Sequence, residues 1–79
     1  GRMNVGQARN KLGMKIVFNG EECEVPGVTS VADLLQRHEL DAKHVAVEVN
    51  LELAPRGRHR EWMLQEGDRV EVVTLVGGG

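Results

Sequence analysis

The first regular pattern in the chain begins at Met14. Residues 14–19, MKIVFN, place an apolar side chain at every second position, which is the period of a strand with one buried face. Asn19-Gly20 tolerates the positive φ angles of a type I′ turn. Cys23 and Val25 then alternate with glutamates on the returning side. The pattern therefore predicts a β-hairpin.

A helix is predicted directly after this hairpin. Pro26 ends the second strand because proline cannot donate to a ladder, and Thr29 or Ser30 can cap the helix. Asp33 suits the positive end of the helix dipole. Four residues recur at helical spacing and predict one stripe that lies on the sheet: Val31, Leu34, Leu35 and His38.

The second half of the chain again reads as strands and turns. Residues 45–49, VAVEV, alternate as a strand, and Leu51 and Leu53 suggest a short one before Pro55. Arg56 to Glu61 is predicted to be a polar loop, with Trp62 and Leu64 covering the core behind it.

The last predicted strand runs from Val70 to Leu75, after a turn at residues 66–68. Its alternation turns Val70 and Val72 toward the helix and Val73 and Leu75 away from it. Apolar residues on an outward face just before the end of a chain suggest a docking surface, so we assign partner binding to Val73, Leu75 and Val76.

The order of elements predicts an α+β fold of the β-grasp, or ubiquitin-like, type. A hairpin, a helix and then further strands give a mixed sheet of four to five strands with one main helix on one face. The last strand of such a sheet lies centrally, beside the first. We therefore expect one domain over residues 14–76 and a free tail, Gly77 to Gly79.

Charge separates the first thirteen residues from this domain. Residues 1–13 contain three basic residues, no acid and no strand or helix period, so we interpret them as a flexible leader, an expression remnant or upstream artefact. Without them, seven Lys and Arg face twelve acids, a formal charge of minus five. An acidic domain with two aromatic residues argues against nucleic-acid binding.

The size and composition of the chain exclude several further classes. Seventy-nine residues suffice for one modest core and leave little for a deep substrate cavity, so we do not expect an enzyme. No run of residues has the length of a membrane span, and no signal peptide is visible, which makes a cytoplasmic protein and no membrane partner the expectation. We also expect a monomer.

The residues that most often bind metals or act as nucleophiles are sparse. Cys23 is the only cysteine and lies at an inward-facing strand position, which favours a core role over a reactive one. His38, His44 and His59 lack the spacing of metal ligands, and we interpret them as surface or cap residues. We therefore predict neither a metal site nor a catalytic residue.

Three segments together resemble the ThiS family of thiamin-biosynthesis sulfur carriers: MKIVFNGEECEVPGVTSVADLL, VAVEVNLELAPR and LQEGDRVEVVTLVGGG. The likeness covers essentially all of residues 14–79. Each segment alone is weakly specific, but their order, spacing and termination at glycines are specific together. Arg56 matches the proline-arginine pair of ThiS-like sequences and is therefore added to the partner-binding residues.

The resemblance implies a carrier whose Gly79 carboxylate is adenylated by a ThiF-type enzyme. The adenylate is then converted to a thiocarboxylate with sulfur from a donor of the cysteine desulfurase type and is used by thiazole synthase. ATP belongs to the activating partner, since the chain has no phosphate-binding glycine loop. Gly77 and Gly78 lack side chains, so the three glycines, which span roughly 10 Å when extended, can thread a narrow channel.

Two other functions remain open on the sequence. The small subunit of molybdopterin synthase shares the fold and the terminal glycines, although its longer chain and aromatic-proline approach fit less well than LVGGG. A β-grasp interaction module that is never activated would retain the fold and make the tail incidental.

Overall fold

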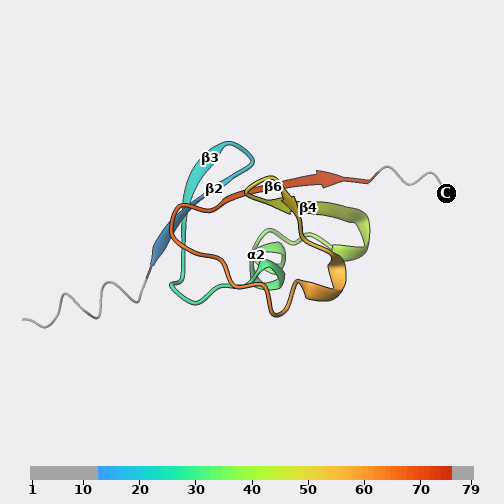
Figure 1. The fold of residues 1–79 in the computed structure, drawn as a ribbon, viewed down its shortest axis with the longest axis horizontal. Coiled ribbons are helices and arrows are strands. Elements are labelled where there is room, and N and C mark those ends of the chain that lie inside the picture. The colour runs from blue at the N-terminus through green and yellow to red at the C-terminus, as the bar shows by residue number, and fades with distance from the viewer. Residues whose placement is uncertain (1–12, 76–79) are drawn as a thin grey trace, which may run out of the picture.

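The computed structural model describes residues 13–75, and it confirms the β-grasp architecture (Figure 1). The predicted leader other than Gly13, and Val76 to Gly79, lie outside the described residues. The strands are β2 (Met14–Phe18), β3 (Glu21–Val25), β4 (Val45–Val49), β5 (Glu52–Leu53) and β6 (Arg69–Thr74). The helices are α2 (Val31–Arg37) and two short 3₁₀ turns, η1 (Ala42–His44) and η2 (Arg56–Arg58).

The hairpin forms around the predicted turn. Asn19 and Gly20 both have positive φ, 51° and 87°, as a type I′ turn requires. The turn sets the register of β2 against β3, with Met14 opposite Val25 and Ile16 opposite Cys23. The apolar residues of both strands consequently share one face of the sheet.

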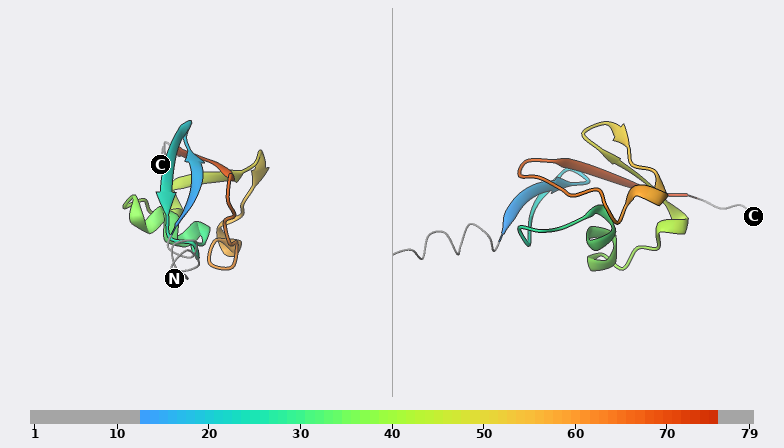
Figure 2. Two further views of the ribbon diagram at one scale, coloured as in Figure 1. Left: turned by 90° about the vertical axis from the view of Figure 1, so that its left-hand side faces the viewer. Right: turned by 60° about the horizontal axis from the view of Figure 1, so that its bottom comes forward.

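The five strands are ordered β3-β2-β6-β4-β5, so the last long strand is central (Figures 1 and 2). β6 runs parallel to β2 and antiparallel to β4. The prediction that the final strand lies beside the first is therefore confirmed. The strand is observed over Arg69–Thr74, one residue earlier at each end than predicted.

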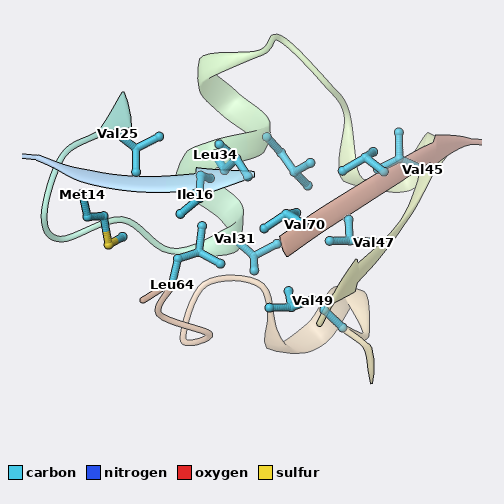
Figure 3. Close-up of a cluster of buried hydrophobic side chains, with 13 residues drawn as sticks. Met14, Ile16, Val25, Val31, Leu34, Val45, Val47, Val49, Leu64 and Val70 are labelled. Atoms are coloured by element: carbon cyan, nitrogen blue, oxygen red, sulfur yellow. The ribbon is translucent and has the colours of Figure 1, made fainter. Parts of the chain in front are cut away.

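Helix α2 covers one face of the sheet, and thirteen buried apolar side chains fill the space between them (Figure 3). Val31, Leu34 and Leu35 form the buried stripe of the helix. Phe18, Cys23 and Trp62 pack against the edge of this core while partly buried. None of the helices described over residues 13–75 has the length and apolar character of a membrane span.

The start of α2 is fixed by two sets of hydrogen bonds. Ser30 and Asp33 form a reciprocal capping box. The backbone N–H groups of Val31 and Ala32 donate to the carbonyl oxygens of Trp62 and His59. These last two bonds hold the segment after η2 against the helix, which confirms that Trp62 and Leu64 cover the core.

One histidine contradicts its predicted place. His59 is buried, with 4% of its surface exposed, and its Nε2 lies 2.8 Å from the carbonyl oxygen of Ala54. The prediction that His59 is a surface residue was wrong. The arginines on either side of it indicate a solvated loop, and no local pattern shows that the backbone turns this side chain inward. His44 is exposed as expected. His38 was also predicted to belong to the stripe that lies on the sheet, but it is the exposed cap residue after the end of α2, and its ring stacks on Phe18 with ring centroids 4.1 Å apart.

Candidate functional site

The candidate site begins on the outward face of β6. Val70 and Val72 are buried beneath the sheet, whereas Glu71, Val73 and Leu75 are exposed. Val73 exposes 59% of its surface and Leu75 exposes 51%. Two aliphatic side chains on the central strand thus remain in water, on the face that the helix does not cover, as the alternation predicted.

Neighbouring strands extend this apolar surface. Ala46 lies opposite Val73 in the β4·β6 register, so the two side chains share a face. Leu53 lies opposite Glu48 on the adjacent strand and exposes 61% of its surface. We call Val73, Leu75, Ala46 and Leu53 the outer patch. Ala46 and Leu53 were missing from the predicted site because only strand pairing places them on this face, Ala46 beside Val73 and Leu53 beside Glu48.

The outward face of the sheet becomes acidic beside the outer patch. Glu48 and Glu71 lie directly opposite one another in the register of β4 and β6. Like charges in that position destabilise a sheet by a small amount. The fold gains nothing from this pair, and the outer patch consequently has a negative flank.

The end of β6 is held by η1. The N–H of Leu75 donates to the carbonyl oxygen of His44 at 2.8 Å. Asp41 caps η1, with Oδ1 accepting from the N–H of Lys43 at 2.9 Å. The last residue that the structure describes is therefore still bonded to the domain.

Charges around η1 act on the Asp41 carboxylate. The backbone hydrogen bond from Lys43 is the largest cause that lowers the pKa of Asp41, and the positive charges of His44, Lys43 and Arg56 lower it further. His44 Nδ1 lies 3.8 Å from Asp41 Oδ2. The predicted partner-binding residue Arg56 is thus one of the positive charges that act on this carboxylate.

The arginine that follows in η2 has local partners. Arg58 pairs with Glu61 at 2.6 Å, and its guanidinium lies 6.0 Å from the Trp62 ring centroid. Such contacts occupy the charge within its own loop. Arg56 is exposed and, among the salt bridges of residues 13–75, takes part in none, so its charge remains available to a partner.

The remaining predicted site residues differ in what the structure shows of them. Val76, Gly77, Gly78 and Gly79 lie outside the described residues. Cys23 is partly buried against the core, in keeping with its predicted packing role. Within residues 13–75 no three His, Cys, Asp or Glu side chains gather as a metal site would require. The site is therefore an apolar and charged surface that leads to the chain end.

Comparison with known proteins gives one consistent result. The model of the ThiS family matches residues 16–79. The crystal structure of the thiamine biosynthesis protein ThiS from Geobacter metallireducens superposes with a TM-score of 0.72 at 32% identity, covering 84% of this chain and all of that one. The sulfur carrier protein ThiS of Bacillus subtilis is 40% identical over 50 residues, which is 63% of this chain and 76% of that protein.

A second kind of relative is much longer. A thiazole synthase of Paramagnetospirillum magneticum is 39% identical over 66 residues, 84% of this chain, and one of Magnetococcus marinus matches to the same extent. The chain spans only 20% of the length of these two proteins. Each of these two proteins, both named thiazole synthase, thus contains a segment that is similar to this chain.

Proposed function

The chain belongs to the ThiS family, and from this premise we propose that it is a sulfur carrier for thiamin biosynthesis that acts through the carboxylate of Gly79. The observation that carries the proposal is the family match through the last glycine, on a domain whose central strand leads to those glycines. In this function the chain is a co-substrate of other enzymes, which we place in the cytoplasm.

The chemistry requires activation because a carboxylate is a poor electrophile. The Gly79 carboxylate attacks the α-phosphate of ATP held by a ThiF-type adenylating enzyme, and pyrophosphate leaves. The persulfide of a donor of the cysteine desulfurase type attacks the adenylate, and AMP leaves, so that the chain end is joined to the donor cysteine through an acyl disulfide. A thiol reductant then attacks the donor's sulfur, forms a disulfide with it and releases the chain end. The product is a terminal thiocarboxylate, which is a better nucleophile than the carboxylate it replaces.

Each part of the site has a role in this proposal. Gly77 and Gly78 let the chain end enter a channel too narrow for a Cβ atom. Val73, Leu75 and Val76 contact the partner, and the exposed Arg56 steers the approach of an acidic surface. Binding to the enzyme then holds the carboxylate next to the α-phosphate, and such positioning of reacting groups supplies much of the rate enhancement.

We propose thiazole synthase as the enzyme that consumes the sulfur. The support comes from the two long relatives of that name, each containing a segment similar to this chain. A sulfur carrier and a thiazole synthase among the relatives favour thiazole formation over molybdopterin synthesis.

Intact-protein mass spectrometry tests the proposal directly. Incubation with ATP and a matched ThiF-type enzyme is expected to add the mass of AMP, and a sulfur donor is then expected to replace one oxygen by sulfur. Tandem mass spectrometry should locate the change at Gly79, and the reaction without ATP is the control. A chain that stays unmodified beside an enzyme that activates a known carrier would contradict the proposal and favour an interaction module.

A further inference from the structure

Strand β6 extends past the end of β2, which is its neighbour on one side. On the β4 side, five residue pairs run from Val49 opposite Val70 to Val45 opposite Thr74. On the β2 side, only two pairs exist, Val17 with Arg69 and Phe18 with Val70. Figures 1 and 2 show β6 continuing past the tip of the β2–β3 hairpin.

The pairing fixes where each backbone group of β6 points. The N–H of Leu75 donates to His44 and the carbonyl oxygen of Arg69 accepts from Asn50, so odd-numbered residues bond toward β4. The carbonyl oxygen of Val70 accepts from the N–H of Asn19, so even-numbered residues face the β2 side. The backbone N–H and carbonyl groups of Val72 and Thr74 therefore point to the β2 side of β6, at positions beyond the last residue of β2.

Only the first of these groups has a substitute partner. The N–H of Val72 donates to the side-chain Oδ1 of Asn19 at 2.8 Å, which closes the end of the β2 pairing. By the same alternation the β4 ladder does not use the N–H of Thr74 or the carbonyl oxygens of Val72 and Thr74, and none of the turn, loop or side-chain hydrogen bonds of residues 13–75 involves them. A donor and two acceptors thus form an open strand edge.

This edge is short, but it lacks several of the features that usually block pairing. Exposed strand edges are commonly blocked by lysine, proline or a bulge. Here the edge residue is Thr74, in the β-favouring sequence EVVTL, and the strand carries neither lysine nor proline. An extended peptide backbone can form hydrogen bonds with the alternating N–H and carbonyl groups of a strand edge. The addition of such a strand to a sheet is a common mode of peptide recognition.

We propose that an extended strand of thiazole synthase pairs with this edge of β6, next to Thr74. The proposal rests on the proposed function. The occupant is chosen because the edge adjoins the outer patch and leads to the residues that carry the sulfur, and because similar segments share a polypeptide with thiazole synthases. A strand that pairs at Thr74 lies beside the last residues that the structure describes, which precede Gly79 in the sequence by only a few positions.

Amide hydrogen exchange, followed by NMR on the isotopically labelled full chain, tests the proposal. In the free chain the Thr74 amide is expected to exchange rapidly, while the Val73 amide is protected by its pairing with Ala46. Saturation with thiazole synthase should slow exchange at Thr74 at least about tenfold with little change at Val73. Unchanged exchange at Thr74 in the saturated complex would overturn the proposal.

A substitution provides a second measurement. Thr74→Pro removes an N–H that the β4 ladder does not use, and proline is tolerated on strand edges. Affinity for thiazole synthase should fall roughly tenfold, with the thermal midpoint nearly unchanged. Thr74→Val, which retains the N–H and the β-branched shape, is the matched control and should bind as the wild type does. Equal affinity of a folded Thr74→Pro variant would also overturn the proposal.

Adenylation by the ThiF-type enzyme, measured in parallel, separates this inference from the proposed function. If the wild type gains the thiocarboxylate and binds the synthase while Thr74 exchanges freely, the edge proposal fails and the function stands. If the chain is not adenylated and no complex forms, both fail. If Thr74 becomes protected as the concentration of this chain alone rises, the occupant is a second copy and the synthase strand is rejected.

Discussion

His59 anchors the loop between β5 and β6 from within. Since the carbonyl oxygen of Ala54 only accepts hydrogen bonds, His59 Nε2 must donate, and the described residues offer no partner to Nδ1. The carbonyl oxygen of the same residue caps Ala32 of α2. One side chain thus links the loop to the strand before it, and its backbone links the loop to the helix.

Replacing His59 should destabilise the whole domain. His59→Ala deletes the ring, leaves the Ala54 carbonyl oxygen unpaired and opens a cavity, at a cost of about 1–3 kcal/mol in free energy of unfolding. Urea denaturation measures this cost. His44→Ala, on an exposed side chain, is the matched control and should change stability little. Equal stability of both variants would show that the buried ring contributes nothing.

Asp41 predicts a local dependence on pH. Its pKa is lowered by the hydrogen bond from Lys43 and by nearby positive charges, so the folded state favours the carboxylate. The cap of η1 is therefore complete above the pKa of aspartate in an unfolded chain and is lost as the pH falls through the lower, folded value.

An NMR titration of the Asp41 carboxyl carbon checks this prediction. The midpoint is expected below the ordinary range for aspartate, and the Lys43 amide shift should titrate with it. Asp41→Asn retains an acceptor without a titrating group, so in this variant the Lys43 amide should not follow the pH. A midpoint at or above the ordinary value would contradict the cap.

At the scale of elements, β6 separates stability from recognition by alternate residues. Val72→Ala removes buried methyl groups and should cost about 1–3 kcal/mol of stability. Val73→Asp changes a side chain that is mostly exposed, so the fold should survive while binding to the ThiF-type enzyme and thiazole synthase weakens. Thermal melts and binding assays on both variants test the assignment. If Val73→Asp unfolds the domain and Val72→Ala is silent, the two faces are reversed.

Elements with a regular period were predictable from the sequence, and those that depend on contacts between distant residues were not. Met14 to Val25, the stripe of α2 and the faces of β6 follow from local spacing and turn chemistry. Burial of His59 does not, because it depends on a carbonyl five residues away and on a loop folded onto α2. Its charged neighbours predict the opposite.

The candidate site shows the same division. Val73 and Leu75 were predictable because alternation along a single strand defines their face. Ala46 and Leu53 join them only through the pairing of β4 with β5 and β6, which no local pattern specifies. The open edge at Thr74 arises because only the end of β2 pairs with the start of β6, an offset between the two strands that appears only once the register is known.

At the scale of the whole molecule, the core and the proposed chemistry occupy separate regions. Helix α2 and the buried side chains lie on one face of the sheet (Figures 1 and 3). The alternation of buried and exposed residues along β4 and β6 turns the outer patch to the other face. β2 begins at one end of the domain and β6 ends at the opposite one (Figure 1). A partner that binds the outer patch would therefore lie beside the end of β6 and would not contact the core.

This separation predicts that the last two residues serve activity alone. The thirteen buried apolar side chains of residues 13–75 lie between Met14 and Val72, and glycine has no side chain to bury, so deleting Gly78 and Gly79 should change the free energy of unfolding by less than about 0.5 kcal/mol. Adenylation should vanish, because the new terminal carboxylate falls short of the α-phosphate. Thermal melts and intact-mass assays on the same samples measure both effects, with Val72→Ala as the converse control, since it weakens the fold and leaves the chain end intact. A deletion variant that is still adenylated would show that the ThiF-type enzyme accepts a shorter tail, and one that unfolds would show that the glycines contribute to the fold.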